Sequence, residues 1–96
     1  MARPDQLPVD ATCYKTVGPF DADSLPEGLK REHRLKAGTW GLLTLMEGEV
    51  AFVWDDEEGG EDVLRAPATI VVPPEIPHHL RLVGPFRLGI GFHRAG

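Results

Sequence analysis

Two histidines, His33 and His78, stand where a ring nitrogen could bind a metal ion or hydrogen-bond a buried ligand. His78 follows Pro77 and opens an alternating segment in which it shares a face with Leu80 and Leu82. Proline has no N–H for a sheet ladder, so Pro77 fits only the first position of this strand. We therefore expect the His78 imidazole to point inward, either as a satisfied core residue or as a metal ligand.

The segment 28–36 predicts a strand, because its residues alternate between a uniformly charged face and a face that begins and ends with a leucine. The second face carries Leu29, Arg31, His33 and Leu35. His33 and Arg31 are therefore expected to point toward the interior or its mouth. A guanidinium in that position needs an acidic partner, such as Glu75, or an anionic ligand. Arg31 is thus a candidate for binding an anionic substrate.

Three further side chains are candidates for the same site. Glu75 lies in a proline-rich turn, where its carboxylate could reach a metal or remain solvated. His93 shares a face with Gly89 and Gly91, so it is a third nitrogen ligand only if these glycines leave room for a cavity. Trp40 is a candidate for contact with a substrate, and packing in the core or in a dimer interface is the alternative.

The elements that must position these residues are short strands. Eleven glycines and nine prolines among 96 residues, with apolar segments between them, are typical of an all-β sandwich or barrel. Turns are expected at Glu47-Gly48 and at Glu57–Glu61, the second as an acidic hairpin tip. The predicted strands cover 12–17, 28–36, 39–46, 49–54, 62–65, 68–72, 78–83 and 86–94.

We expect a flexible arm over residues 1–11 and one domain over 12–96.

Composition and charge exclude several classes of function for this protein. A net charge of -5 with no cluster of Lys and Arg argues against a nucleic-acid partner. No apolar run reaches the length of a membrane span, and the first residues lack a signal-peptide core, so a cytoplasmic protein is expected. A single cysteine, Cys13, forms no internal disulfide and leaves metal binding to nitrogen and oxygen ligands.

Two motifs resemble those of the cupin superfamily. The stretch from Pro73 to His78 is similar to the second cupin motif, Pro-x-Gly-x-x-His, with Glu75 in place of the glycine, and Gly48 resembles the glycine that closes the first motif. The segments 31–40, 46–49 and 73–78 together resemble the small cupin family typified by the N-terminal domain of tellurite-resistance protein B. This similarity runs from about Lys15 to His93.

The resemblance implies a single small cupin-like β-barrel, an antiparallel double-sheet jelly roll, linked to tellurite resistance and stress response without an established reaction. It also implies a divalent metal, zinc, nickel, iron, copper or manganese, held by His33 and His78 and completed by Glu75 or His93 and water. A full cupin centre has two more ligands, and in this sequence Leu35 and Gly41 occupy their positions.

Three functions follow from these observations. The first is a metal-binding domain that takes a small molecule or an oxyanion in its barrel. The second is a metal-free module that binds a small anion directly through Arg31, His33 and His78. The third is a structural or regulatory homodimer without catalysis. Exposed sheet edges favour a homodimer in each case. No residue stands out as a general base, so enzymatic activity is left open.

Overall fold

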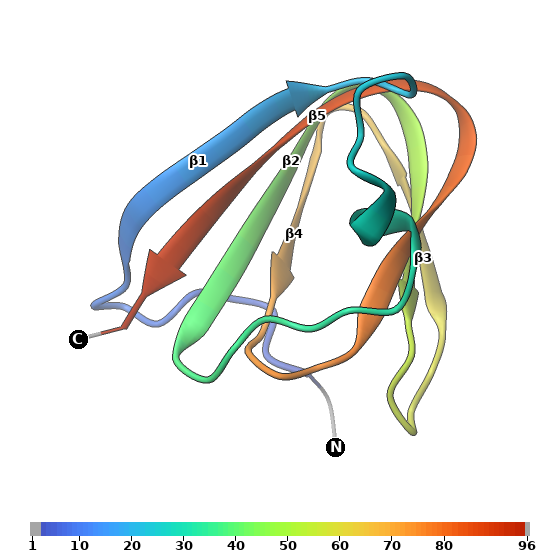
Figure 1. Ribbon diagram of the computed structural model, residues 1–96. Coiled ribbons are helices and arrows are strands. Elements are labelled where there is room, and N and C mark those ends of the chain that lie inside the picture. The colour runs from blue at the N-terminus through green and yellow to red at the C-terminus, as the bar shows by residue number, and fades with distance from the viewer. Residues whose placement is uncertain (1–2, 96) are drawn as a thin grey trace.

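The computed structural model describes residues 3–95 and is built almost entirely of antiparallel strands (Figure 1). This confirms the all-β class. Its elements in chain order are β1 (Thr12–Phe20), the short 3-10 helix η1 (Glu27–Lys30), β2 (Thr39–Trp54), β3 (Glu61–Arg65), β4 (Ala68–Val72) and β5 (His78–Arg94).

The long strands β2 and β5 form the centre of the sheet and pair along almost their whole length. β1 adds to the second half of β5, while β3 and β4 pair with the second and first halves of β2. The β2–β5 ladder shifts register on both sides of Gly48, and such bulges bend a sheet. Figure 1 shows β5 curving over the domain at this end. The bend turns the two halves of each long strand toward a shared core.

The sheet does not close into the expected barrel. In the described part of the chain, β1 pairs only with β5, whereas β3 and β4 pair only with β2. The sheet has five strands, and small barrels with a side-chain-filled interior have about eight. The connection 21–38, which contains η1, supplies apolar cover instead: Leu25 is buried, and Leu29 and Leu35 pack against the core.

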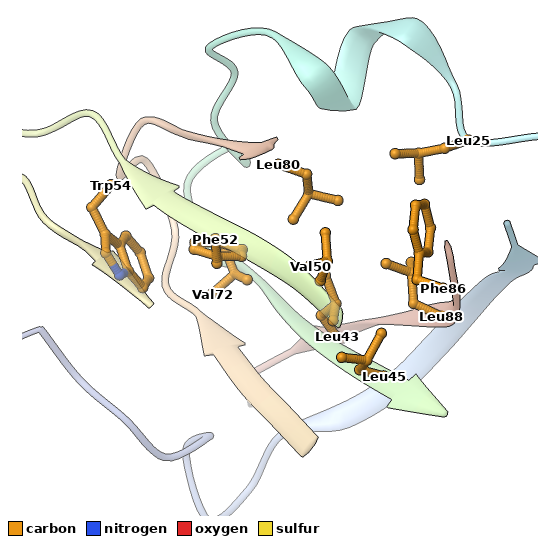
Figure 2. Packing of buried hydrophobic residues seen from close by; sticks show 10 residues of the cluster. All are labelled: Leu25, Leu43, Leu45, Val50, Phe52, Trp54, Val72, Leu80, Phe86 and Leu88. Carbon is orange, nitrogen blue, oxygen red and sulfur yellow. The ribbon is translucent and has the colours of Figure 1, made fainter. Parts of the chain in front are cut away.

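The core lies between the two halves of the bent sheet (Figure 2). Leu45, Val50, Phe52 and Leu88 are its largest fully buried side chains. Gly48 makes their common packing possible, because its φ of +77° is a left-handed conformation that favours glycine. A Cβ at this position would also lie 1.9 Å from the Pro85 carbonyl oxygen.

Several predicted strand boundaries change in the structure. The segments 39–46 and 49–54 form one strand, as do 78–83 and 86–94, because the expected turns are bulges inside the ladder. The first strand also continues past Gly18-Pro19 to Phe20. The strand predicted at 28–36 is wrong: this segment begins in η1 and then makes a single bridge at His33. β4 has the predicted bounds.

The N-terminal arm contacts the domain through Arg3. Its guanidinium donates hydrogen bonds to the Asp56 carboxylate at 2.8 and 2.6 Å and to the Gly59 carbonyl at 2.6 Å. Residues 1–2 of the predicted arm and residue 96 of the predicted domain lie outside the described residues. Within those described, no helix is long and apolar enough to cross a membrane.

Candidate functional site

His33 and His78 lie against each other inside the bend of the sheet. Their backbone N–H groups each donate to the other residue's carbonyl at 2.9 Å, and this antiparallel bridge places both side chains on one face. The ring centres are 4.3 Å apart, with an angle of 67° between the planes. The two imidazoles approach each other as expected, although the sheet around them is not a closed barrel and His33 is only partly buried.

The backbone also selects the tautomer of both rings. Nδ1 of His33 lies 2.8 Å from the Arg31 carbonyl oxygen, and Nδ1 of His78 lies 2.8 Å from that of Ile76. A carbonyl oxygen only accepts, so each neutral ring must carry its proton on Nδ1. Both Nε2 atoms therefore keep a lone pair. Neither has a hydrogen-bond partner within residues 3–95, and neither is fully buried.

A cavity of about 80 Å³ opens beside the two rings. It is smaller than the roughly 150 Å³ that accommodate benzene in an apolar core, so it suits an ion with a few waters or a very small molecule. Phe52 stacks on His78 at 5.1 Å between ring centres. Apart from the two histidines the lining is apolar, and it consists of Leu29, Leu35, Gly41, Leu43, Phe52, Val72, Leu80, Ile90 and Phe92.

His78 is neutral in this setting. Only 4% of the residue is exposed, and burial, assisted by the nearby His33, lowers the pKa of its imidazole to about 4. The cavity lining contains no Lys, Arg, Asp or Glu. The site therefore presents two Nε2 atoms surrounded by hydrocarbon.

Two of the predicted ligand-binding residues lie outside this cavity. The Arg31 side chain is exposed, and the inward direction expected for it is wrong. The cause is η1, which interrupts the alternation on which that expectation depended. Glu75 is also exposed, in a left-handed conformation with φ of 63°. Its N–H donates to the Leu35 carbonyl at 2.8 Å, which fastens the turn to the connection.

His93 and Trp40 lie on the other face of the sheet. Ile90 and Phe92 line the cavity, so alternation along β5 turns His93 away from it. His93 instead lines a second hollow, with Cys13 opposite it on β1. Trp40 faces His93 from β2 and is likewise absent from the cavity lining. The structure thus brings His33 and His78 together and leaves the other candidates apart.

The two positions that would complete a cupin centre do lie in the cavity wall. Leu35 and Gly41 both line it, and a Cβ on Gly41 would lie 3.2 Å from Cδ1 of Leu35. The side chains of Leu35 and Gly41 have no atom that could bind a metal, so both ligand positions are lost. Within residues 3–95 no group of three or more His, Cys, Asp or Glu side chains could hold a metal ion. A cation here would have two protein ligands.

The sequence did not indicate the apolar residues that line the cavity beside the histidines. Phe52 and Val72 line the cavity, yet neither was singled out as a site residue. Alternation within the predicted strands 49–54 and 68–72 already placed them on defined faces. The missing information was the bend in β2, which turns those faces toward His78.

The fold and site define a small all-β domain in which a bent antiparallel sheet encloses a pair of histidines. The chain belongs to the TehB-like domain family, whose model matches residues 15–90. A curated relative is the probable S-adenosyl-L-methionine-dependent methyltransferase TehB of Haemophilus influenzae strain 10810. It is 38% identical over 47 residues, which are 49% of this chain and 16% of that protein.

Solved structures share the fold. TehB from Haemophilus influenzae superposes with a TM-score of 0.83 at 27% identity, over 91% of this chain and 32% of that one. A protein of Escherichia coli strain K12 gives 0.84 at 22% identity, over 95% and 97% of the two chains. Hydroxypropylphosphonic acid epoxidase from S. wedmorenis gives 0.56 at 24% identity, over 74% and 39%, and shares the fold alone.

Proposed function

We propose that the domain binds a divalent metal ion through Nε2 of His33 and Nε2 of His78, together with a small molecule or oxyanion. The observation that carries the proposal is the shared tautomer, because both Nδ1–H groups are held by backbone carbonyls. Histidines that ligate metals almost always donate their other ring N–H in this way. Imidazole nitrogen suits zinc, copper, iron and nickel, and manganese remains a candidate if oxygen ligands complete its shell.

The charge balance of the cavity suggests why an anion should accompany the metal. Two imidazoles without charge leave a divalent ion uncompensated, and the lining is otherwise apolar. An unpaired charge in such surroundings is costly. A small oxyanion would supply both the missing ligands and the missing charge, so we propose that cation and anion bind cooperatively. Metal binding itself is known for a protein with a similar fold, since crystal structures exist of hydroxypropylphosphonic acid epoxidase with iron(II) and with cobalt(II).

Thermal melting tests this proposal with zinc, nickel or manganese, added alone and with phosphate or tellurite. A ligand that binds only the folded state raises the melting temperature in proportion to the logarithm of its concentration. We expect a larger shift from metal and oxyanion together than from either alone, and its loss in His33→Ala and His78→Ala. His79→Ala is the matched control, because His79 pairs with Asp55 outside the cavity. An unchanged shift in His78→Ala would contradict the proposal.

A metal-free site is the second candidate, favoured by Leu35 and Gly41 at the positions of the missing ligands. Two Nε2 lone pairs in an apolar cavity would accept hydrogen bonds from an uncharged donor such as a small alcohol or amide. A bare anion would instead meet two lone pairs and no cationic side chain in the lining. Binding of formamide that survives a chelator, and that is lost in His78→Ala, would favour this candidate.

We further propose that the domain is a binding unit and does not itself transfer methyl groups. The named activity belongs to a relative of which this chain matches 16%. The described residues form strands and one short 3-10 helix, whereas open α/β sheets bind nucleotide cofactors between strands and helices. Calorimetry with S-adenosyl-L-methionine should give no heat of binding. A dissociation constant in the micromolar range would contradict this assignment.

We also propose a cytoplasmic homodimer. The outer edge of β1 is unpaired within the described chain, and such edges are usually covered or blocked. Several large apolar side chains are exposed, among them Tyr14, Met46 and Val63. Sedimentation should give twice the 10.5 kDa chain mass at micromolar concentration. A single-chain mass would contradict the dimer and leave the cavity proposals unaffected.

A further inference from the structure

A second hollow lies on the outer face of the sheet, over the strands β1, β5 and β2. Its volume is about 360 Å³. Gly89 and Gly91 form part of its floor. Three side chains around this floor carry metal-binding atoms, and they come from three different strands: Cys13, Met46 and His93.

Cys13 and His93 are direct neighbours across the β1–β5 ladder. Residues directly opposite each other in an antiparallel pair project to the same face, with Cβ atoms about 4.5–5.5 Å apart. Both side chains also lean over Gly91. A Cβ on that glycine would lie 3.3 Å from Nε2 of His93 and 3.6 Å from Sγ of Cys13. The thiol and the imidazole therefore converge on one point that Gly91 leaves open.

Met46 approaches the same floor from β2. Its terminal Cε would lie 3.4 Å from a Cβ on Gly89, two residues before Gly91. The residue is 43% exposed. An unbranched thioether has three rotatable bonds, so the Met46 side chain, which lines the same hollow as Cys13 and His93, can change its position over this floor.

These donors favour one class of cation. Thiolate and thioether sulfur are soft ligands that select copper(I), and imidazole is compatible with them. Zinc would require four ligands, of which this face supplies fewer. Although the sequence alone pointed to nitrogen and oxygen ligands, we propose that Cys13, His93 and Met46 bind one soft cation of the copper(I) and silver(I) class. On binding, the Cys13 thiol releases its proton, its sulfur bonds to the cation, and its weak hydrogen bond to the Lys15 carbonyl is lost.

The test is an anaerobic titration with copper(I), buffered by the coloured chelator bicinchoninate, and with silver nitrate in chloride-free buffer. We expect one ion per chain. Cys13→Ser should abolish binding. His93→Gln removes a direct ligand. Because the loss of even an outer-shell partner of a ligand costs roughly 10- to 100-fold in metal affinity, this variant should bind at least that much more weakly. Met46→Leu should weaken it by a smaller factor. His79→Gln is the matched control and should bind like the wild type, because His79 pairs with Asp55 away from this floor.

Two results would overturn the proposal. If His93→Gln binds copper(I) as tightly as the wild type, Cys13 acts as an isolated thiol and no site is built around it. If one ion is bound for every two chains, the thiol bridges two molecules. Melting curves of the ion-free variants distinguish either result from misfolding, because Cys13 is exposed and His93 is only partly buried.

Discussion

The guanidinium of Arg3 lies 4.3 Å from the ring centre of Trp54. Trp54 in turn packs against Phe52 at 4.6 Å and lies edge-on to His78 at 6.3 Å. Trp54 and Phe52 thus connect the N-terminal arm with the histidine pair through a row of ring contacts. Figure 2 shows Trp54 at one end of the buried cluster, next to Phe52.

Replacement of Arg3 should therefore destabilise the domain and alter the tryptophan environment. A cation–π contact contributes about 0.5–1 kcal/mol at an exposed site and more when it is desolvated, and Arg3→Ala also removes the hydrogen bonds to Asp56. Urea unfolding followed by fluorescence measures the loss. Arg94→Ala is the control, since Arg94 stacks on the exposed Tyr14 at the same distance. Equal losses in the two variants would show that the arm adds nothing specific.

Acidification should weaken the fold through His78. Its pKa is about 4 in the folded protein and near 6.5 in the unfolded chain, so the unfolded state binds the extra proton between these values. The contribution of His78 to stability is fully present above pH 6.5 and is lost as the pH decreases to 4, a change of about 3 kcal/mol. Urea unfolding between pH 4 and 7 measures this slope. His78→Gln should flatten it and His79→Gln should not; an equal slope in His78→Gln would contradict the assignment.

Gly48 should tolerate substitution less well than another glycine with positive φ. Gly59 has φ of +63° and nothing within 4 Å of an added Cβ. Gly59→Ala should therefore lower the free energy of unfolding by about 1–2 kcal/mol, which is the cost of holding a residue with a Cβ in the left-handed conformation. Gly48→Ala adds the clash with the Pro85 carbonyl, and overpacking typically costs a further 1–3 kcal/mol. Chemical unfolding compares the two variants. A Gly48→Ala protein as stable as Gly59→Ala would show that the β2–β5 bend relaxes without cost.

Restoring a missing ligand should strengthen metal binding. Leu35 lines the cavity beside the histidines, so Leu35→His offers a third imidazole. Removal of an outer-shell partner of a metal ligand typically lowers metal affinity by roughly 10- to 100-fold. A new direct ligand should therefore raise the affinity for nickel or zinc by at least the same factor. Calorimetry measures the gain. Leu35→Asn is the control for polarity without an imidazole, and an equal gain in that variant would contradict direct ligation.

The sequence predicted the part of the site that depends on local rules. Pro77 fixes the start of β5, and period-two alternation then directs His78 inward. The proline at Ala66-Pro67 likewise separates β3 from β4 at the predicted place. His33 also points inward, although the strand predicted around it is absent. Its direction is set by the single bridge to His78, a contact between residues far apart in the chain.

The errors have a common physical origin in long-range pairing. Glu47-Gly48 has the local character of a turn, but pairing with Arg87 and Phe86 keeps it inside a ladder. Arg31 would face inward only in a strand, and η1 exposes it instead. His93 does stand over a space left by glycines, as the sequence suggested, yet this space is on the opposite face of β5 from the cavity.

The position of β5 between β1 and β2 affects how the protein can form during translation. β1 leaves the ribosome early, but the strand that pairs with it is the last of the described elements to be made. Until then β2 also lacks its longest partner, and the peptide that carries His78 has not yet met His33. Domains generally fold as units as synthesis proceeds, so this one should stay unfolded on the ribosome until residue 94 has emerged. Its nascent apolar strands therefore stay exposed until β5 has been made.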